Sequence, residues 1–544
     1  MKEHSIYGQS QMNQQTGLRL LLIGLAISTS FHFLEKADAR LPQTLLDTFL
    51  PFPQGAVGDS FGSAIAVSGE NVAVGIPGFD SGNIQDVGAV QVYIGTLIPG
   101  FYNCSQTLKT TGALVSVAAS DGCGSSVAIS PNWIAAGAPN WDTSVLPIKY
   151  NCGAVFVWNR EPLPPNSWNA VPITVLHQNP FEQDRFGTSV TLHEDVNGVI
   201  LAVGTPTDGL GNGNTSGAYV NRGSVSLYKY NNQTLEWEQN GFIPAFPISQ
   251  QTNLNMANGF FGVSIAIFGD YMVIGAHRQS VTKSRQGTAF VFKRGGVFVP
   301  QNPDNQNQLW GEWKFVQRLV SQNPKIDDQF GWVVGITPWN IIVGAPAGIA
   351  PESINEIGSA SIWRLDPLDL IEPAKDPSTF SDGFPGDQFG YSVLIESATV
   401  QIGAVGFDTP SNQNTGCVYQ FKRFSTACSL WTQETPILPP PSANIANSRF
   451  GTSLALATNC ILVSSLHGAN QVPDQGVVFS FMIPQPPEPC ETDFNGDGGT
   501  DGEDLLLLLS HWGGPGGDVN GDGTTNGADL TYAFHIWGPC VCGD

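Results

Sequence analysis

The sequence predicts an all-β protein, a seven-bladed β-propeller, followed by a small α-helical domain with two acidic loops. Three observations lead to this prediction. A unit of about sixty residues recurs seven times before residue 483. Glycine makes up 62 of the 544 residues, and 13% of residues are charged, about half the usual share, which favours short strands and turns over long helices. From residue 490 onward, the chain has ten acidic residues and no Lys or Arg.

The charge balance bears on the class of partner. Acidic residues outnumber basic ones 46 to 23, which gives a net charge of −23. The average field of such a protein repels nucleic acids and anionic membrane surfaces. We therefore expect neither as a partner.

Residues 1–39 have the pattern of a secretory signal peptide. An apolar run, Leu20–Phe33, follows Arg19 and precedes the small-x-small site Ala37–Ala39. The run is too short for a comfortable membrane span, and no second span follows, so the mature chain is expected to begin at Arg40 without an integral membrane segment. An uncleaved N-terminal anchor is the alternative.

The repeat at 40–483 contains three elements in a fixed order. The first is a Phe-Gly pair, in which Cys replaces Phe once, at Phe61, Cys123, Phe186, Phe261, Phe330, Phe389 and Phe450. Gly-Ala-Pro or a variant follows fourteen residues later in most units, as at Gly137–Pro139, and then a glycine opens a β-rich run such as Gly88–Val90. Short runs of Val, Ala and Ile between turn residues predict strands, and four strands per unit predict propeller blades.

The propeller geometry assigns roles to the repeated residues. The Phe would lie between neighbouring sheets, and the glycines would let backbones approach closely. The last unit supplies three strands, ending in Val477–Ile483. We expect Leu45–Phe52 to supply the fourth strand and close the ring, which removes exposed sheet edges.

At these residues the chain resembles the FG-GAP repeat family, which forms the propeller of integrin α-chains and of many secreted bacterial proteins. The resemblance implies a propeller that presents loops for binding. Several members carry an Asp/Asn-rich calcium loop between the first two elements, but here that link is mostly as short as Ser68–Glu70. The longer third-unit turn, Glu194–Gly198, lacks the full set of carboxylates, so calcium is not expected in the propeller.

The nine cysteines suggest disulfides, because an exported chain favours them over reduced thiols. They form three local groups: Cys104, Cys123 and Cys152; Cys417, Cys428 and Cys460; Cys490, Cys540 and Cys542. Because nine is odd, at least one thiol is free or intermolecular. Cys490 with Cys540 or Cys542 would join the two ends of the tail.

A proline-rich linker at 484–489 precedes the tail at 490–544, where an oxygen-rich loop occurs twice, 25 residues apart. The first copy places candidate metal ligands at Asp493, Asn495, Asp497, Gly499, Asp501 and Asp504. The second places them at Asp518, Asn520, Asp522, Thr524, Asn526 and Asp529. These are positions 1, 3, 5, 7, 9 and 12 of an EF-hand loop, with glycine at position 6. We expect two Ca²⁺ ions, with tighter binding in the first loop, which has four carboxylates against three.

One acidic loop alone could be an ordinary turn, but here each loop leads into an apolar helix, predicted at Leu505–Trp512 and Leu530–Trp537. Position 12 is Asp, and no helix precedes the first loop. The tail thus resembles the type I dockerin module, which implies calcium binding and a cohesin-like or cell-surface partner held by the duplicated helices. Positions 10 and 11, Gly502–Glu503 and Gly527–Ala528, depart from the small hydroxyl pair familiar in that module.

No catalytic motif stands out against the repeat. Gly58–Gly62 matches the G-x-S-x-G nucleophile elbow, but the same slot recurs in other units without a serine and without a following helix. The histidines form no HExxH motif. Trp141, Trp332 and Trp339 could stack on sugars, although blade cores also use tryptophan.

We therefore expect a secreted, non-enzymatic, calcium-binding protein. The propeller would bind a protein or glycan, and the tail would dock or anchor it. The alternatives are a component of an extracellular polysaccharide-degrading assembly and, within that class, a glycoside hydrolase or lyase.

Overall fold

The structure is a computed structural model. It describes residues 44–51, 55–110, 117–143, 147–161, 167–209, 220–245, 257–295, 313–346, 357–365, 371–373, 379–382, 384–396, 399–423, 431–467, 472–483, 492, 499–500, 502–514, 517, 524–535 and 538–539. The predicted signal peptide (1–39) and linker (484–489) lie outside the described residues. Where the chain is described, no helix is both long and apolar enough to cross a membrane.

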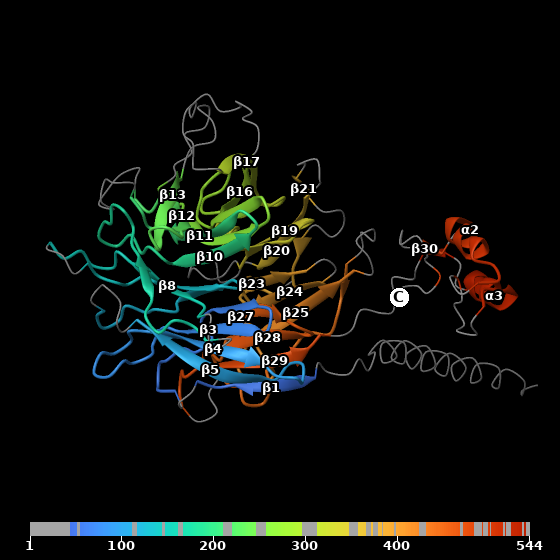
Figure 1. The fold of residues 1–544 in the computed structure, drawn as a ribbon, viewed down its shortest axis with the longest axis horizontal. Coiled ribbons are helices and arrows are strands. Elements are labelled where there is room, and N and C mark those ends of the chain that lie inside the picture. The colour runs from blue at the N-terminus through green and yellow to red at the C-terminus, as the bar shows by residue number, and fades with distance from the viewer. Residues whose placement is uncertain are drawn as a thin grey trace, which may run out of the picture. The chain divides into compact units, whose positions relative to one another are not determined.

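Seven antiparallel sheets of four or five strands account for the repeat, one sheet per unit (Figure 1). The first strands of the blades are β2 (Ile65–Ser68), β6 (Ser126–Ile129), β10 (Ser189–Asp195), β14 (Phe261–Phe268), β18 (Val333–Ile336), β23 (Phe389–Ile395) and β27 (Phe450–Ala457). The second strands are β3 (Asn71–Ile76), β7 (Trp133–Ala138), β11 (Gly198–Thr205), β15 (Tyr271–Ala276), β19 (Asn340–Ala345), β24 (Thr399–Ala404) and β28 (Cys460–Ser465).

The third strands are β4 (Ala89–Gly95), β8 (Ala154–Asn159), β12 (Ser224–Asn231), β16 (Thr288–Arg294), β20 (Ser359–Leu365), β25 (Cys417–Lys422) and β29 (Val477–Met482). The fourth strands are β5 (Tyr102–Lys109), β9 (Ile173–Val175), β13 (Glu236–Pro244), β17 (Trp313–Leu319), β21 (Ile371–Pro373), β26 (Thr432–Gln433) and β1 (Leu45–Phe49), and β22 (Thr379–Phe380) also pairs with β20. The predicted strand at Trp313–Leu319 has the observed bounds.

The first strand of each blade contacts the first strand of the next, from β2 to β6 and onward to β27, which contacts β2 again. The ring is therefore closed. The seventh sheet has the order β1-β29-β28-β27, with Phe49 paired to Val478. The predicted closure by the N-terminal strand is confirmed, although the strand ends at Phe49.

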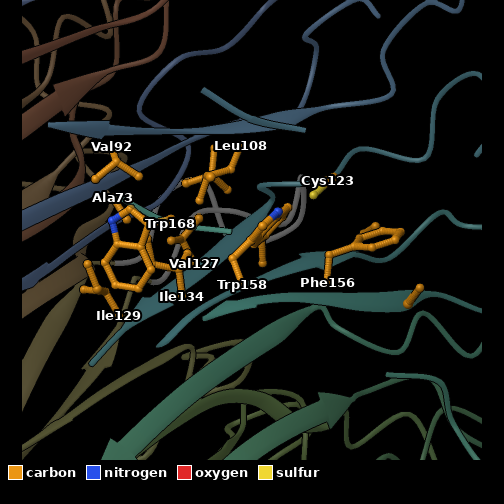
Figure 2. Close-up of a cluster of buried hydrophobic side chains, with 14 of the residues drawn as sticks. Ala73, Val92, Leu108, Cys123, Val127, Ile129, Ile134, Phe156, Trp158 and Trp168 are labelled. Carbon is orange, nitrogen blue, oxygen red and sulfur yellow. The ribbon is translucent and has the colours of Figure 1, made fainter. Parts of the chain in front are cut away.

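The repeated Phe lies in the core between neighbouring blades, as predicted. Phe261 is fully buried in a cluster that includes Val225 and Leu227 of blade 3 and Phe290 of blade 4. Figure 2 shows the corresponding cluster of blades 1 and 2, in which Cys123 takes the place of Phe. This packing is the main hydrophobic contact between blades.

The glycines permit close approach between blades. A Cβ on Gly275 of blade 4 would lie 2.0 Å from the carbonyl oxygen of Gly331 in blade 5. The same contact recurs between Gly137 and the Gly187 oxygen, at 1.9 Å. The glycine of Gly-Ala-Pro therefore faces the glycine of the next Phe-Gly, which explains why the two motifs recur together.

The described part of the tail contains two helices, α2 (Gly502–Ser510) and α3 (Gly527–His535), each of nine residues, and two short paired strands, β30 (Gly499–Thr500) and β31 (Gly538–Pro539) (Figure 1). Each helix begins three residues before the predicted start and ends two residues before the predicted end.

Candidate functional site

The turns before the Phe-Gly pairs are stabilised by buried aspartates. The Oδ2 atoms of Asp121 and Asp184 accept backbone N–H bonds from Ala118 at 2.7 Å and Phe181 at 2.6 Å. Asp59 and Asp328 make the same contact in their blades. These aspartates therefore cap the turns.

Burial raises the pKa of these carboxyl groups. The pKa of Asp184 is raised to about 8 by burial and then by the nearby Asp208. The pKa of Asp121 is raised to about 7, mainly by burial. The Oδ1 atom of each has no hydrogen-bond partner among the described residues. These groups hold protons near neutral pH, but they are too buried to reach a substrate.

Ser60 lies in such a turn and not in a nucleophile elbow. Its φ is 54°, its hydroxyl donates to the Gly58 oxygen at 3.3 Å, and the following element is the strand β2. The described geometry therefore gives Ser60 a turn role.

The long turn of blade 3 joins blades through its carboxylates. Glu194 accepts hydrogen bonds from Ser130 Oγ at 2.8 Å and Asn132 Nδ2 at 2.7 Å in blade 2. Asp195 pairs with Arg294 of blade 4, which also contacts Asp270 at 3.1 Å. Both carboxylates are thus engaged by protein groups.

The prediction of disulfides is wrong for the five described cysteines, Cys104, Cys123, Cys152, Cys417 and Cys460, which are free. All but Cys104 are buried in the blades. Closeness in sequence did not imply contact, because successive units form separate sheets. Cys428, Cys490, Cys540 and Cys542 lie outside the described residues.

The three candidate sugar-stacking tryptophans differ in their surroundings. Trp141 is buried in the core cluster of blades 1 and 2. Trp339 is 48% exposed, in the turn between β18 and β19. Trp332 is half-buried, and its ring contacts His277 and Tyr391.

Five of the twelve predicted metal ligands belong to the described residues: Gly499, Asp504, Thr524, Asn526 and Asp529. The other seven, Asp493, Asn495, Asp497, Asp501, Asp518, Asn520 and Asp522, lie outside them. Within the described part, no group of three or more His, Cys, Asp or Glu side chains is placed to hold a metal ion.

The second loop forms a capping box at the start of α3. Asn526 Oδ1 accepts the Ala528 N–H, and Asp529 Oδ2 accepts the Asn526 N–H, each at 2.8 Å. The carboxylates at position 12 are buried, with 1% exposure for Asp504 and 0% for Asp529. This cap explains why α3 begins at Gly527.

The two halves of the tail pair their backbones reciprocally. Thr525 exchanges backbone hydrogen bonds with the segment after α2, accepting from Gly513 at 2.9 Å and donating to Gly514 at 2.7 Å. Thr500 pairs with Gly538, after α3. Both contacts join equivalent positions of the repeat, so each half completes the other.

The tail helices expose large apolar side chains. Leu506 on α2 is 68% exposed, Trp512 after it is 51% exposed, and Phe534 on α3 is 54% exposed. Leu507 and Leu509 are also exposed. An apolar surface on so short a segment is typical of an interaction site.

Comparisons with known proteins bear on the propeller alone. The FG-GAP repeat family matches residues 255–292, which include β14, β15 and most of β16. A comparison with curated protein sequences gave no match. Among solved structures, the periplasmic gluconolactonase PpgL of Pseudomonas aeruginosa is similar, at 12% identity and a TM-score of 0.41, over 69% of this chain and 85% of that one. A likeness at this level says nothing about a reaction. The family match lies in blade 4 and covers Phe261-Gly262 and Gly275-Ala276, elements that recur with variation in the other blades.

Proposed function

We propose that this chain is a secreted, calcium-dependent binding protein without catalytic activity. The propeller acts as a platform for a protein or glycan, and the tail docks the protein to a cohesin-like or cell-surface partner. The observation that carries this proposal is the exposed apolar surface on the duplicated helices. Each acidic loop also has one buried carboxylate at its last position, Asp504 in the first loop and Asp529 in the second.

The buried Asp504 and Asp529 support the calcium assignment. A bound cation would offset the burial of these carboxylates, in addition to hydrogen bonds such as the one that Asp529 Oδ2 accepts from the Asn526 N–H. Calcium would be held by the oxygen groups at positions 1, 3, 5, 7, 9 and 12 of each loop. The bound ion would supply a fixed positive charge at the start of α2 and of α3. Short tails with little core gain stability from such binding.

Calcium binding is tested by calorimetric titration of the full chain. Two ions per chain are expected, with one ion lost in Asp504→Asn and the other in Asp529→Asn. Asp270→Asn, in the propeller, is the matched control and keeps both ions. Binding of no ion at millimolar calcium would contradict the proposal.

Docking is tested by capture from a surface extract with calcium-loaded protein. The captured species should be lost when EGTA is added, because EGTA removes the metal. It should also be lost when Leu506 and Trp512 are both changed to Ser, because these changes remove the apolar contact. Capture that persists in the double variant would place the docking surface elsewhere.

A component of a polysaccharide-degrading assembly is the second candidate, favoured by the dockerin-like tail and by the exposed Trp339. Release of reducing sugar from polymers by the purified chain would support an enzyme of this class. Binding of a polymer without release would support a non-catalytic subunit.

A further inference from the structure

Four ring side chains form a continuous row across blades 4, 5 and 6. The ring centroids of Phe260 and His277 are 5.2 Å apart, those of His277 and Trp332 are 5.1 Å apart, and those of Trp332 and Tyr391 are 5.6 Å apart. Phe260 directly precedes β14, and Trp332 directly precedes β18. We name these four residues the aromatic arc.

An arginine stacks on each end of the arc. The guanidinium carbon of Arg278 lies 5.7 Å from the Phe260 ring, and that of Arg449, from blade 7, lies 5.3 Å from the Tyr391 ring. Neither guanidinium has an ion pair with a described residue, whereas Arg285 nearby pairs with Asp327. The arc thus has a guanidinium group at each end.

The fold does not require these aromatic residues. The slot directly after Phe-Gly holds Trp332 and Tyr391 in blades 5 and 6. In four other blades it holds Ser or Thr, whose hydroxyl closes the turn by donating to the backbone oxygen three residues earlier, at Ser63, Ser125, Thr188 and Thr452. Comparison of the seven blades thus shows that a small hydroxyl residue in this slot is sufficient to form a blade.

Two further slots of the arc are also exceptional. Phe260 occupies the position before Phe-Gly at φ 56°, a left-handed conformation that disfavours bulky residues, and other blades place Ser60, Gly122 or Gln329 there. His277 replaces the proline found in four blades. It is 7% exposed, and its Nδ1 has no hydrogen-bond partner among the described residues. Strain and an unpartnered polar atom together favour a role beyond folding.

The geometry points to an acidic peptide segment of a partner protein as the occupant of the arc. This inference rests on the proposed role of the propeller as a binding platform. The two arginines would bind carboxylates, and the half-buried rings of Phe260, Trp332 and Tyr391 would contact an apolar side chain. Trp, Tyr and Arg are the residues that most often dominate the energy of protein interfaces.

The ring planes decide between a peptide and a glycan. Successive rings are inclined by 46°, 89° and 47°, so the arc offers no flat platform on which successive sugar rings could stack. The inclined rings instead leave an uneven surface, which a peptide side chain can complement. The arginines at both ends also disfavour a cationic segment.

The test measures binding of a fluorescent nonapeptide of alternating Glu and Leu to the full chain by anisotropy. Peptides with Lys or Ser in place of Glu are controls, as is a neutral β-linked glucose hexamer. The acidic peptide should bind most tightly, with an affinity that falls as salt is raised. No binding of this peptide at millimolar concentration, or tighter binding of the hexamer, overturns the inference.

Variants locate the binding site. Arg449→Gln and Trp332→Ser, which insert residues that other blades carry in those slots, should each weaken peptide binding by about tenfold. Arg185→Gln changes the slot of Arg449 in blade 3, outside the arc, and should leave affinity unchanged. Equal loss in Arg185→Gln and Arg449→Gln overturns the inference. The Trp332→Ser chain should still capture the surface partner, because its tail is unchanged. Loss of peptide binding with retained capture therefore separates the arc on the propeller from docking by the tail.

Discussion

Gly275→Ala is expected to destabilise the propeller by about 4 kcal/mol or more. The new Cβ would lie 2.0 Å from the Gly331 carbonyl oxygen and 2.3 Å from Ser264 Oγ. The nearer atom belongs to the backbone of a neighbouring sheet, so relief requires blades 4 and 5 to move apart and lose packing around Phe330. Urea unfolding of the full chain, followed by tryptophan fluorescence, measures the change in free energy.

Gly69→Asn is the matched control. Gly69 has φ 57° in the turn between β2 and β3, and a Cβ there meets nothing within 4 Å. Asn tolerates this backbone conformation, so a change below about 1 kcal/mol is expected. If Gly275→Ala has as small an effect as Gly69→Asn, then the blades are not packed as closely as the structure indicates.

Blade 7 shows how this packing can vary. Ser464 occupies the slot of Gly275, and a Cβ on Gly62 of blade 1 would lie 2.8 Å from the Ser464 Cβ. The Ser464 hydroxyl accepts the Ser453 N–H at 2.9 Å. A side chain is therefore accommodated at the interface where the ring closes, which is the junction formed by both ends of the propeller.

The blade pattern could be predicted from the sequence because the same motifs recur in each of the seven units, so each unit supports the assignment of the others. Six Phe-Gly pairs and one Cys-Gly pair locate the start of each first strand. The last unit lacks a fourth strand, and the strand before the first Phe-Gly can replace it. The confirmed closure of the seventh sheet by the N-terminal strand follows from this argument, and in the structure Phe49 pairs with Val478. The helix starts were less predictable, because hydrophobicity marks Leu505 and Leu530 while capping by Asn526 sets the start of α3 at Gly527.

The aromatic arc could not be predicted in the same way. Phe260 and Tyr391 belong to different units, and the repeat does not show which side chains of neighbouring blades meet. In the sequence, Trp332 is one isolated tryptophan and His277 is one of several scattered histidines. A signal was present in the sequence, since Trp332 and Tyr391 replace Ser or Thr in the same slot, but its meaning depends on the contact between adjacent blades.

The propeller is expected to be more stable at pH 5 than at pH 8, by an amount on the order of 3 kcal/mol. Burial raises the pKa of Asp184 to about 8 and that of Asp121 to about 7, from an ordinary value of 3.8. A raised carboxyl pKa means that the folded state binds the proton more tightly than the unfolded state. The contribution is therefore fully present below pH 3.8 and is lost as the pH rises to about 8.

Asp184→Asn isolates this effect. The amide keeps an oxygen to accept the Phe181 N–H but carries no charge beside Asp208. The variant should exceed the wild-type stability by more at pH 8 than at pH 5, because the wild type loses stability progressively as the pH rises from 3.8 to about 8 and the amide does not titrate. Glu236→Gln, an exposed change on β13, should leave the pH profile unaltered. Urea unfolding at both pH values measures the difference, and a wild-type propeller that gains stability between pH 5 and pH 8 would contradict it, because the buried carboxyl groups would then have to be ionised with favourable partners.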